Sequence, residues 1–187
     1  MASLRLVAHA PTPALRRAVF GGDDELDEGG HTAALVLAGA PLGRPDAIYA
    51  SPARAAVQTA RAAGHEPTIE PAVADCDYGT WAGRTLTDVA AEHPSAVGTW
   101  LTDLDAAPHG GESLNALITR VGNWLDGQAA RDHRLLVFTH ASVIRAALVH
   151  ALHTPRQVFW QVDIAPLSVT HLRARNGRWT LHQPSWR

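Results

Sequence analysis

Hydrophobic residues gather along the chain in short runs that predict strands, separated by longer segments with helical spacing. The strand candidates are residues 4–8, 47–51, 68–71 and 134–139. The last of these, RLLVFT, is almost wholly apolar, as a central strand of a parallel sheet is. Residues 167–183 predict a hairpin turning at Asn176 and Gly177, because Asn-Gly favours a two-residue hairpin turn.

Helices are predicted between the strands, over residues 31–40, 52–64, 113–130 and 142–152, with short helices and loops from about 85 to 108. Pro52 suits the first turn of its helix. In the 113–130 segment, apolar residues recur at helical spacing (Leu114, Leu117, Ile118, Val121 and Leu125). Strands that alternate with helices predict an α/β domain with helices on both faces of a mostly parallel sheet.

Composition and charge argue against several classes of protein. A length of 187 residues favours one domain, and a net charge of -2 without a basic run argues against nucleic-acid binding. All 16 basic residues are arginines. The single cysteine, Cys76, excludes an intrachain disulfide and fits a reducing compartment. Since no signal-peptide pattern or membrane-spanning run is seen, we expect a soluble, cytoplasmic protein with no membrane contact.

Polar residues follow the predicted strands at the edge where ligands bind in such sheets. His9 follows the first strand, Arg54 and Asp75 lie after the second and third, and His140 ends the most apolar one. This set suits phosphoryl chemistry: a histidine can be the nucleophile, cations can stabilise the phosphoryl oxygens, and a carboxyl group can protonate the leaving oxygen. The helices after Pro52 and His140 add backbone N–H donors.

Six segments occur together in an order that resembles one protein family. They are LVAHAPT (6–12), DDELDEGGHTAAL (23–35), SPARAAVQTA (51–60), DCDYGTWAG (75–83), HGGESL (109–114) and FTHASVIRAAL (138–148). Together they resemble the histidine phosphatase superfamily, also called phosphoglycerate-mutase-like. The resemblance implies a three-layer α/β/α fold with a mostly parallel central sheet. It also implies one domain over residues 1–187, with a lid over the site at about 76–112.

The resemblance implies a role for each matching residue. His9 would be the nucleophile that becomes a phosphohistidine, and Arg54 and His140 would hold the phosphoryl group. Asp75 would be the general acid, with Asp77 the alternative two residues on. The reaction would be hydrolysis in two displacements. No metal or cofactor is expected, and the remaining histidines show no spacing typical of metal ligands.

One position departs from the family pattern where the phosphate should bind. Ala8 stands in place of the family's arginine, whose charged hydrogen bonds would each contribute about 1.5–3 kcal/mol. We hypothesise that Arg16 or Arg17, just downstream, supplies the missing charge. Thr12 and the backbone N–H of Ala141 are the other expected phosphate contacts.

Three functions are compatible with the sequence. The favoured one is a metal-independent phosphomonoester hydrolase acting on a small phosphorylated metabolite. The alternative, suggested by Ala8, is a catalytically weakened member that binds a phosphorylated ligand. A phosphomutase is less favoured, because the chain is short between His109 and His140, where mutases carry insertions. A homodimer is compatible with the resemblance, since the family includes monomers, dimers and tetramers.

Overall fold

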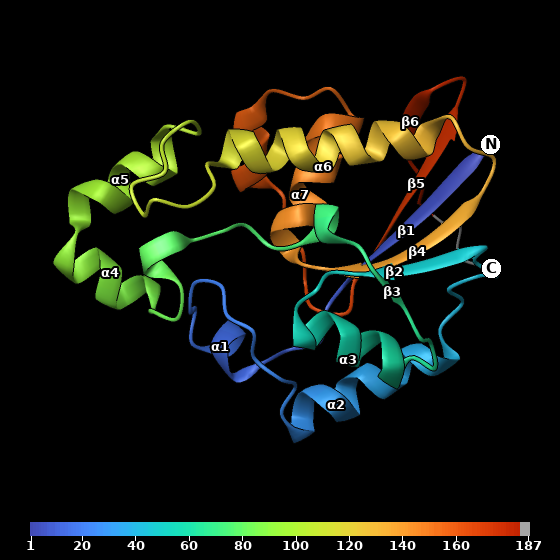
Figure 1. Ribbon diagram of the computed structural model, residues 1–187, viewed down its shortest axis with the longest axis horizontal. Helices are drawn as coiled ribbons and strands as arrows, with labels where there is room; N and C mark the ends of the chain where they lie inside the picture. Colours follow the sequence, from blue (N-terminus) through green and yellow to red (C-terminus); the bar gives the residue numbers. More distant parts are fainter. Residues whose placement is uncertain (184–187) are drawn as a thin grey trace.

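A six-stranded mixed sheet forms the centre of the computed structural model, which describes residues 1–183 (Figure 1). The strands are β1 (Ala2–Ala8), β2 (Ala47–Ala50), β3 (Thr68–Ile69), β4 (Arg134–Thr139), β5 (Val169–Arg175) and β6 (Arg178–Leu181). Their order is β3-β2-β4-β1-β5-β6. The pairs β3–β2, β2–β4 and β4–β1 are parallel, whereas β5 pairs antiparallel with both β1 and β6. The predicted mostly parallel α/β sheet is therefore confirmed.

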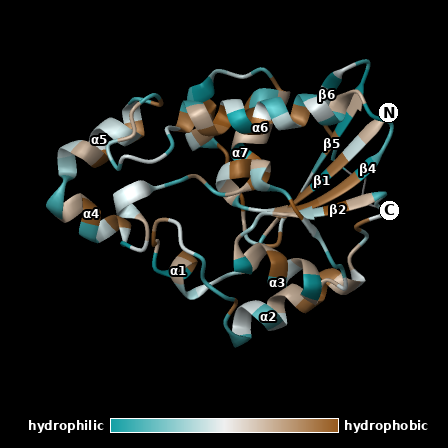
Figure 2. Ribbon diagram, viewed as in Figure 1, coloured by the Kyte–Doolittle hydropathy of each residue, from teal (hydrophilic) through white to brown (hydrophobic). Residues whose placement is uncertain are grey.

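Helices cover both faces of the sheet and complete the three layers (Figure 1). One face packs against α6 (Leu114–Ala129) and α7 (Ala141–Ala151). The other packs against the 3-10 helix η1 (Val36–Gly39) and α3 (Arg54–Ala62), and α2 (Glu28–Leu35) packs beside α3. Side chains of β1 alternate between these layers: Leu4 and Leu6 join the first core and Val7 the second. In Figure 2, α6 carries alternating brown and teal bands, as an amphipathic helix does.

A third, aromatic core lies beyond the carboxyl ends of the parallel strands. It contains Phe20, Trp81, Val89, Val97 and Trp100. The elements around it are α1 (Pro13–Arg16), η3 (Gly79–Trp81), α4 (Leu86–Glu92), α5 (Pro94–Thr102) and η4 (Arg156–Gln161), whereas η2 (Pro71–Val73) lies against α6. Most of residues 76–112 fall in this region, where a lid is predicted.

The structure refines two predicted elements. The helix expected over 31–40 begins at Glu28, because the Asp27 side chain accepts the N–H of Gly30 and caps it. Its last part, Val36–Gly39, is a 3-10 helix. The third strand has only two residues. No helix in the described part of the chain is long and apolar enough to cross a membrane.

Candidate active site

The register of two neighbouring strands places His9 beside His140. Ala8 at the end of β1 pairs with Thr139 at the end of β4, and each histidine is the next residue. The backbone N–H of His9 donates to the Thr139 carbonyl at 2.9 Å. The two imidazole rings meet edge to face, with centroids 5.0 Å apart and an angle of 70° between their planes. Two segments 131 residues apart thus converge because their strands are parallel neighbours.

A backbone contact orients the His9 ring. Its Nδ1 lies 2.7 Å from the Ala10 carbonyl oxygen. Because a carbonyl can only accept, Nδ1 carries the proton and Nε2 keeps its lone pair. Two contacts hold the backbone turn at Ala10. The Thr59 hydroxyl accepts the Ala10 N–H at 2.9 Å, and Gly30 packs closely against the Pro11 carbonyl. A Cβ at Gly30 would lie 2.2 Å from the Pro11 carbonyl oxygen, so this helix position requires glycine.

His140 is buried and held by two side chains. Its Nε2 lies 2.8 Å from the Ser51 hydroxyl, and its Nδ1 lies 3.5 Å from Asp75 Oδ2. Burial lowers the pKa of His140; the Asp75 carboxylate opposes this shift and His9 adds to it. The uncharged imidazole therefore dominates in the free protein at neutral pH. Helix α7 begins at the next residue, Ala141, with no side-chain cap on its first N–H groups.

Asp75 is fixed between α7 and its own loop. Its Oδ1 accepts the Cys76 N–H at 2.8 Å and the hydroxyl of Ser142, and its Oδ2 faces His140. The carboxyl group is 29% exposed, so it reaches solvent beside His9. By contrast, Asp77 uses its Oδ1 to accept the Gly79 N–H within the loop. The structure thus brings Asp75, rather than Asp77, to the two histidines.

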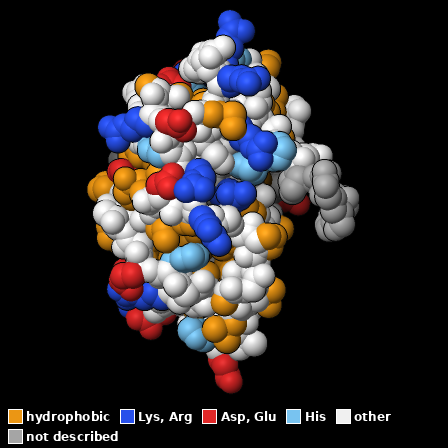
Figure 3. Space-filling model, turned by 90° about the vertical axis from the view of Figure 1, so that its right-hand side faces the viewer, with side chains coloured by type: hydrophobic (Ala, Val, Ile, Leu, Met, Phe, Trp, Pro, Cys, Tyr) orange, Lys and Arg blue, Asp and Glu red, His pale blue; other side chains and the backbone are white. Residues whose placement is uncertain are grey.

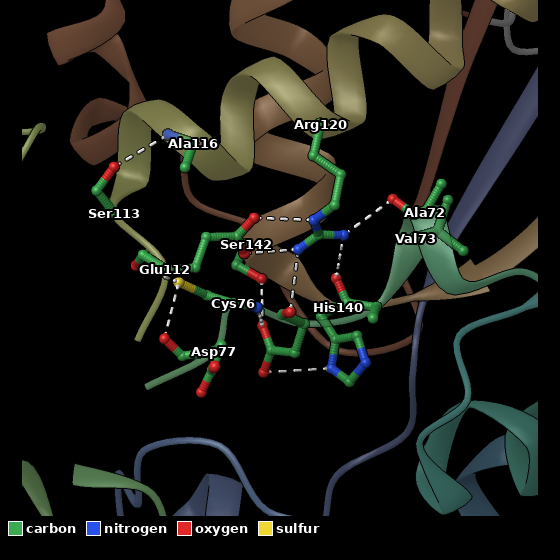
Figure 4. A network of polar contacts seen from close by, with 12 residues as sticks. Ala72, Val73, Cys76, Asp77, Glu112, Ser113, Ala116, Arg120, His140 and Ser142 are labelled. Atoms are coloured by element: carbon green, nitrogen blue, oxygen red, sulfur yellow. Dashed lines mark hydrogen bonds and ion pairs between the residues drawn. The ribbon is translucent and has the colours of Figure 1, made fainter. Parts of the chain in front are cut away.

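Arg120 on α6 holds the loop that carries Asp75 (Figure 4). Its guanidinium pairs with Glu112 at 2.7 Å and donates to the carbonyls of Ala72, Ala74 and Asp75 at 3.0, 3.1 and 3.2 Å. Three carbonyls that would otherwise need other donors are satisfied by one side chain. The glutamate raises the pKa of Arg120, which keeps its charge.

Two adjoining hollows share His9, Asp75 and His140. The smaller, of about 70 Å³, is also lined by Thr12 and by Asp24. The larger, of about 470 Å³, has mainly apolar walls, among them Phe20, Leu86, Leu101, Trp100, Trp160 and Ile164. Tyr78, Leu86, Trp100 and Leu101 come from residues 76–112, where the lid is predicted.

Arg54 lies near these hollows but does not line them. Its Nε lies 3.1 Å from Asp23 Oδ2, and its Nη1 lies 2.9 Å from Glu25 Oε1. Its neighbours Ala53 and Ala55 line the smaller hollow, while its own side chain is 54% exposed. The structure therefore does not bring the predicted phosphate clamp to the two histidines.

The two arginines expected to replace the missing charge also lie elsewhere. Arg16 pairs with Asp27, and Arg17 donates to the Pro13 carbonyl at 3.3 Å. Neither lines either hollow. The positions do not support the hypothesis that one of them replaces the arginine at position 8, because each guanidinium already has another partner. Ala8 itself is buried and lines the larger hollow.

The remaining predicted contacts lie at the site. Thr12 lines the smaller hollow, and its hydroxyl caps α1 by accepting the Leu15 N–H at 3.1 Å. Ala141 lines the larger hollow. Arg145, one turn into α7, also lines the larger hollow while its Nε donates to the Val162 carbonyl at 2.7 Å. In residues 1–183, no group of three or more His, Cys, Asp or Glu side chains is arranged to hold a metal ion.

Sequence reasoning assigned no role to three residues that position the site: Ser51, Arg120 and Ser142. Ser51 and Ser142 lie inside the two segments that carry Arg54 and His140, so their place after a strand was a usable signal. Arg120 lies in the middle of a helix and makes its contacts with a loop 45 to 48 residues earlier in the chain. Nothing in the local pattern distinguishes it from a surface arginine.

Comparison with known proteins gives a consistent family match. The model of the histidine phosphatase superfamily (branch 1) matches residues 4–187. A glucosyl-3-phosphoglycerate phosphatase of Mycolicibacterium vanbaalenii is 32% identical over 146 residues, which are 70% of this chain and 64% of that protein. A bifunctional protein of Mycobacterium tuberculosis is 29% identical over 136 residues, 68% of this chain and 37% of that protein. The chain thus spans less than two thirds of the length of these curated relatives.

Solved structures match over nearly the whole chain. A mycobacterial glucosyl-3-phosphoglycerate phosphatase in complex with VO3 superposes with a TM-score of 0.84 at 26% identity, covering 96% of each chain. A phosphoserine phosphatase mutant from Entamoeba histolytica has a TM-score of 0.86 at 21% identity, covering 98% of this chain and 96% of that one. At that identity the second match concerns the fold alone.

Proposed function

The chain belongs to the histidine phosphatase superfamily (branch 1), and we propose that it hydrolyses small phosphomonoesters without a metal, through a phosphohistidine at His9. One observation carries this proposal. The His9 ring is oriented by the Ala10 carbonyl so that its Nε2 lone pair is available, beside His140 and Asp75 in one hollow. A nucleophile and a proton donor thus share one small space, as group transfer requires.

The proposed reaction has two displacements at phosphorus. In the first, Nε2 of His9 forms a bond to phosphorus while the bond to the ester oxygen breaks, and the Asp75 carboxyl group gives its proton to that oxygen. In the second, water attacks the phosphohistidine, Asp75 takes a proton from the water, and His9 leaves. His140, Thr12 and the N–H of Ala141 hold the phosphoryl oxygens throughout.

The smaller hollow offers little positive charge to balance a bound phosphoryl group. The lining of the smaller hollow contains no arginine among the described residues, and it includes the carboxylate of Asp24. For Arg54 to bind a phosphoryl group, it must exchange Asp23 and Glu25 for the substrate. We therefore propose a slower phosphatase than the family motif implies. The site also supports the second candidate function, a weakened member that binds a phosphorylated ligand.

The walls of the larger hollow indicate the kind of ester that fits. The relatives named above are described as phosphatases of glucosyl-3-phosphoglycerate and of phosphoserine, whose leaving groups are polar. Here the space beside His9 is lined by Phe20, Leu86, Leu101 and Trp160. Because transfer of apolar surface from water to such walls is favourable by roughly 25 cal/mol per Å2, we propose a substrate with an apolar leaving group.

The test measures phosphate release without added metal from 1-naphthyl phosphate, an alkyl phosphate, phosphoserine and a sugar phosphate. The unmodified protein is compared with His9→Ala at mildly acidic and neutral pH. We expect turnover that is fastest for the apolar esters and is lost in the variant, together with an acid-labile, base-stable phosphoryl label on the unmodified protein alone. Turnover that persists in His9→Ala would exclude the phosphohistidine. If the unmodified protein turns over no ester, the binding function is favoured instead.

A further inference from the structure

A second hollow lies at the opposite end of β1 from His9. Its volume is about 630 Å3, and its lining includes Arg5, Arg44, Arg134, Arg173, Gly43 and His133. Figure 3 faces this end of the molecule and shows arginine side chains gathered near its middle. None of these residues belongs to the site around His9.

The carboxylates in this hollow are already engaged. Asp46 pairs with Arg134 at 2.7 Å, which lowers the pKa of that carboxyl group to about 2, and Asp132 pairs with the amino group of Met1 at 2.8 Å. Among residues 1–183, the guanidinium groups of Arg5, Arg44 and Arg173 have no hydrogen bond or ion pair. Three cations thus share one hollow without a counter-charge.

Arg5 and Arg173 are held close together by the sheet. In the antiparallel pairing of β1 with β5, Arg5 lies opposite His171 and Ser3 lies opposite Arg173, so all four side chains share a face. Burial lowers the pKa of Arg5, and the neighbouring Arg173 adds to this shift. Burial, the same two arginines and the neighbouring His182, whose ring centroid lies 4.8 Å away, lower the pKa of His171 to about 4. The positive charges in this hollow therefore repel one another, and a bound anion would relieve that repulsion.

The Arg5 guanidinium lies close to the loop backbone at Gly43. Gly43 has φ +80°, which favours glycine, and a Cβ there would lie 2.7 Å from Arg5 Nη1. His133 also lines the hollow, and its buried Nε2 has no hydrogen-bond partner in the described part of the chain. The guanidinium groups of Arg5, Arg44 and Arg173 are thus placed around the hollow without acceptors among the described residues.

We propose that this hollow is a second binding site, for a small multivalent anion held by Arg5, Arg44 and Arg173. Guanidinium groups present paired N–H donors that match the oxygens of phosphate and carboxylate groups. The shared chemistry of the ligand is two or more such groups on one small molecule, as in an organic diphosphate or a di- or tricarboxylate. The site is independent of the proposed hydrolysis at His9.

The test follows the histidine ring signals of the full chain by NMR during titration with pyrophosphate and, separately, with citrate. Sodium chloride at matched ionic strength is the control, because screening alone also changes these signals. We expect saturable binding that raises the pKa of His171 by about one unit or more. The signal is local, so anion binding near His9 does not mimic it. A response to pyrophosphate alone identifies a phosphate ligand, and a response to citrate alone a carboxylate ligand.

Three variants assign the response to the arginines. Arg5→Gln and Arg173→Gln should each weaken binding at least tenfold, and Arg44→Gln, in an exposed loop, tests the site without touching the sheet. Arg61→Gln removes the same charge from α3, where Arg61 pairs with Glu66, and should bind as the unmodified protein does. No saturable change at His171 with either anion, the same change with sodium chloride, or equal weakening in Arg61→Gln would overturn the proposal.

Discussion

The two ends of β1 differ in whether the nearby arginines have carboxylate partners. At the carboxyl end, His9, His140 and Asp75 surround a hollow, while the nearby Arg16 and Arg54 are bound by Asp27, Asp23 and Glu25. At the amino end, three arginines line a hollow and have no acidic partner among the described residues. Strand register places the two imidazoles, whereas the carboxyl group of Asp75 is placed by a loop that Arg120 holds. The direction of each arginine depends instead on the carboxylates that its neighbouring loops supply.

The largest expected effect tests whether the carboxyl group at this end of β1 acts as the proton donor. Asp75→Asn should lower kcat by roughly 10²–10⁴-fold for an alkyl phosphate, because the amide cannot protonate the leaving oxygen. For 4-nitrophenyl phosphate, whose leaving group needs little protonation, the loss should be much smaller. Steady-state kinetics on both esters separate a proton donor from a residue that only positions His140.

Asp77→Asn is the matched control for that change. Asp77 is exposed and bonds the Gly79 N–H within its loop, away from the two histidines. Its kcat should stay close to that of the unmodified protein. Equal losses in both variants, on both esters, would show that the loop conformation and not the Asp75 proton is what matters.

A smaller effect, a gain in kcat/KM rather than a loss, is expected when an arginine is introduced at position 8. Ala8 lines the larger hollow beside His9, so the side chain of Ala8→Arg has space to reach a bound phosphoryl group. One added charged hydrogen bond of about 1.5–3 kcal/mol corresponds to a gain in kcat/KM of roughly 10- to 100-fold. Ala8→Gln, of similar length without charge, should give little of this gain. A folded Ala8→Arg protein with unchanged kcat/KM would mean that the phosphoryl group does not bind within reach of position 8.

A few-fold effect is expected from freeing Arg54. Asp23→Asn together with Glu25→Gln removes both carboxylates that hold the guanidinium. If Arg54 then turns to the substrate, KM should fall by roughly three- to tenfold, since exposed ion pairs contribute only about 0.2–1 kcal/mol and compete weakly. Adding Arg54→Ala to the pair should abolish this gain. If KM falls equally with and without Arg54, the cause is the lower negative charge near the hollow.

Much of the fold follows from local patterns that the structure keeps. The apolar run at 134–139 is β4, and the Asn176-Gly177 turn has φ +53° and +73°, the left-handed values that this hairpin needs. The missed start of α2 has a local cause, since the Asp27 cap lies ahead of the apolar residues of that helix. The four-residue helix α1 was not expected, because one turn is too short to show a periodic pattern.

The site is predictable only as far as strand ends fix it. His9, Asp75 and His140 could be placed together from their positions after strands, and they lie together. Arg54 occupies the same kind of position, yet its side chain is directed by Asp23 and Glu25 on a separate loop. A sequence shows that such carboxylates exist but not which of them a flexible arginine will reach. For the same reason, the sequence does not predict that the arginines at the amino end of β1 lie together in one hollow.

The smallest expected effect concerns how each end responds to acid. His140 at one end and His171 at the other both have a pKa below the usual 6.5, and for His171 the value is about 4. As pH falls below 6.5, these histidines become protonated in the unfolded chain but stay uncharged in the folded one, so the free energy of unfolding decreases. For His171 this loss ends below about pH 4. His171→Gln should therefore unfold with a flatter pH dependence between 6.5 and 4, a difference on the order of 1 kcal/mol, or a few degrees in Tm. Urea titrations at several pH values measure this, and parallel curves for the two proteins would show that folding does not lower the pKa of His171.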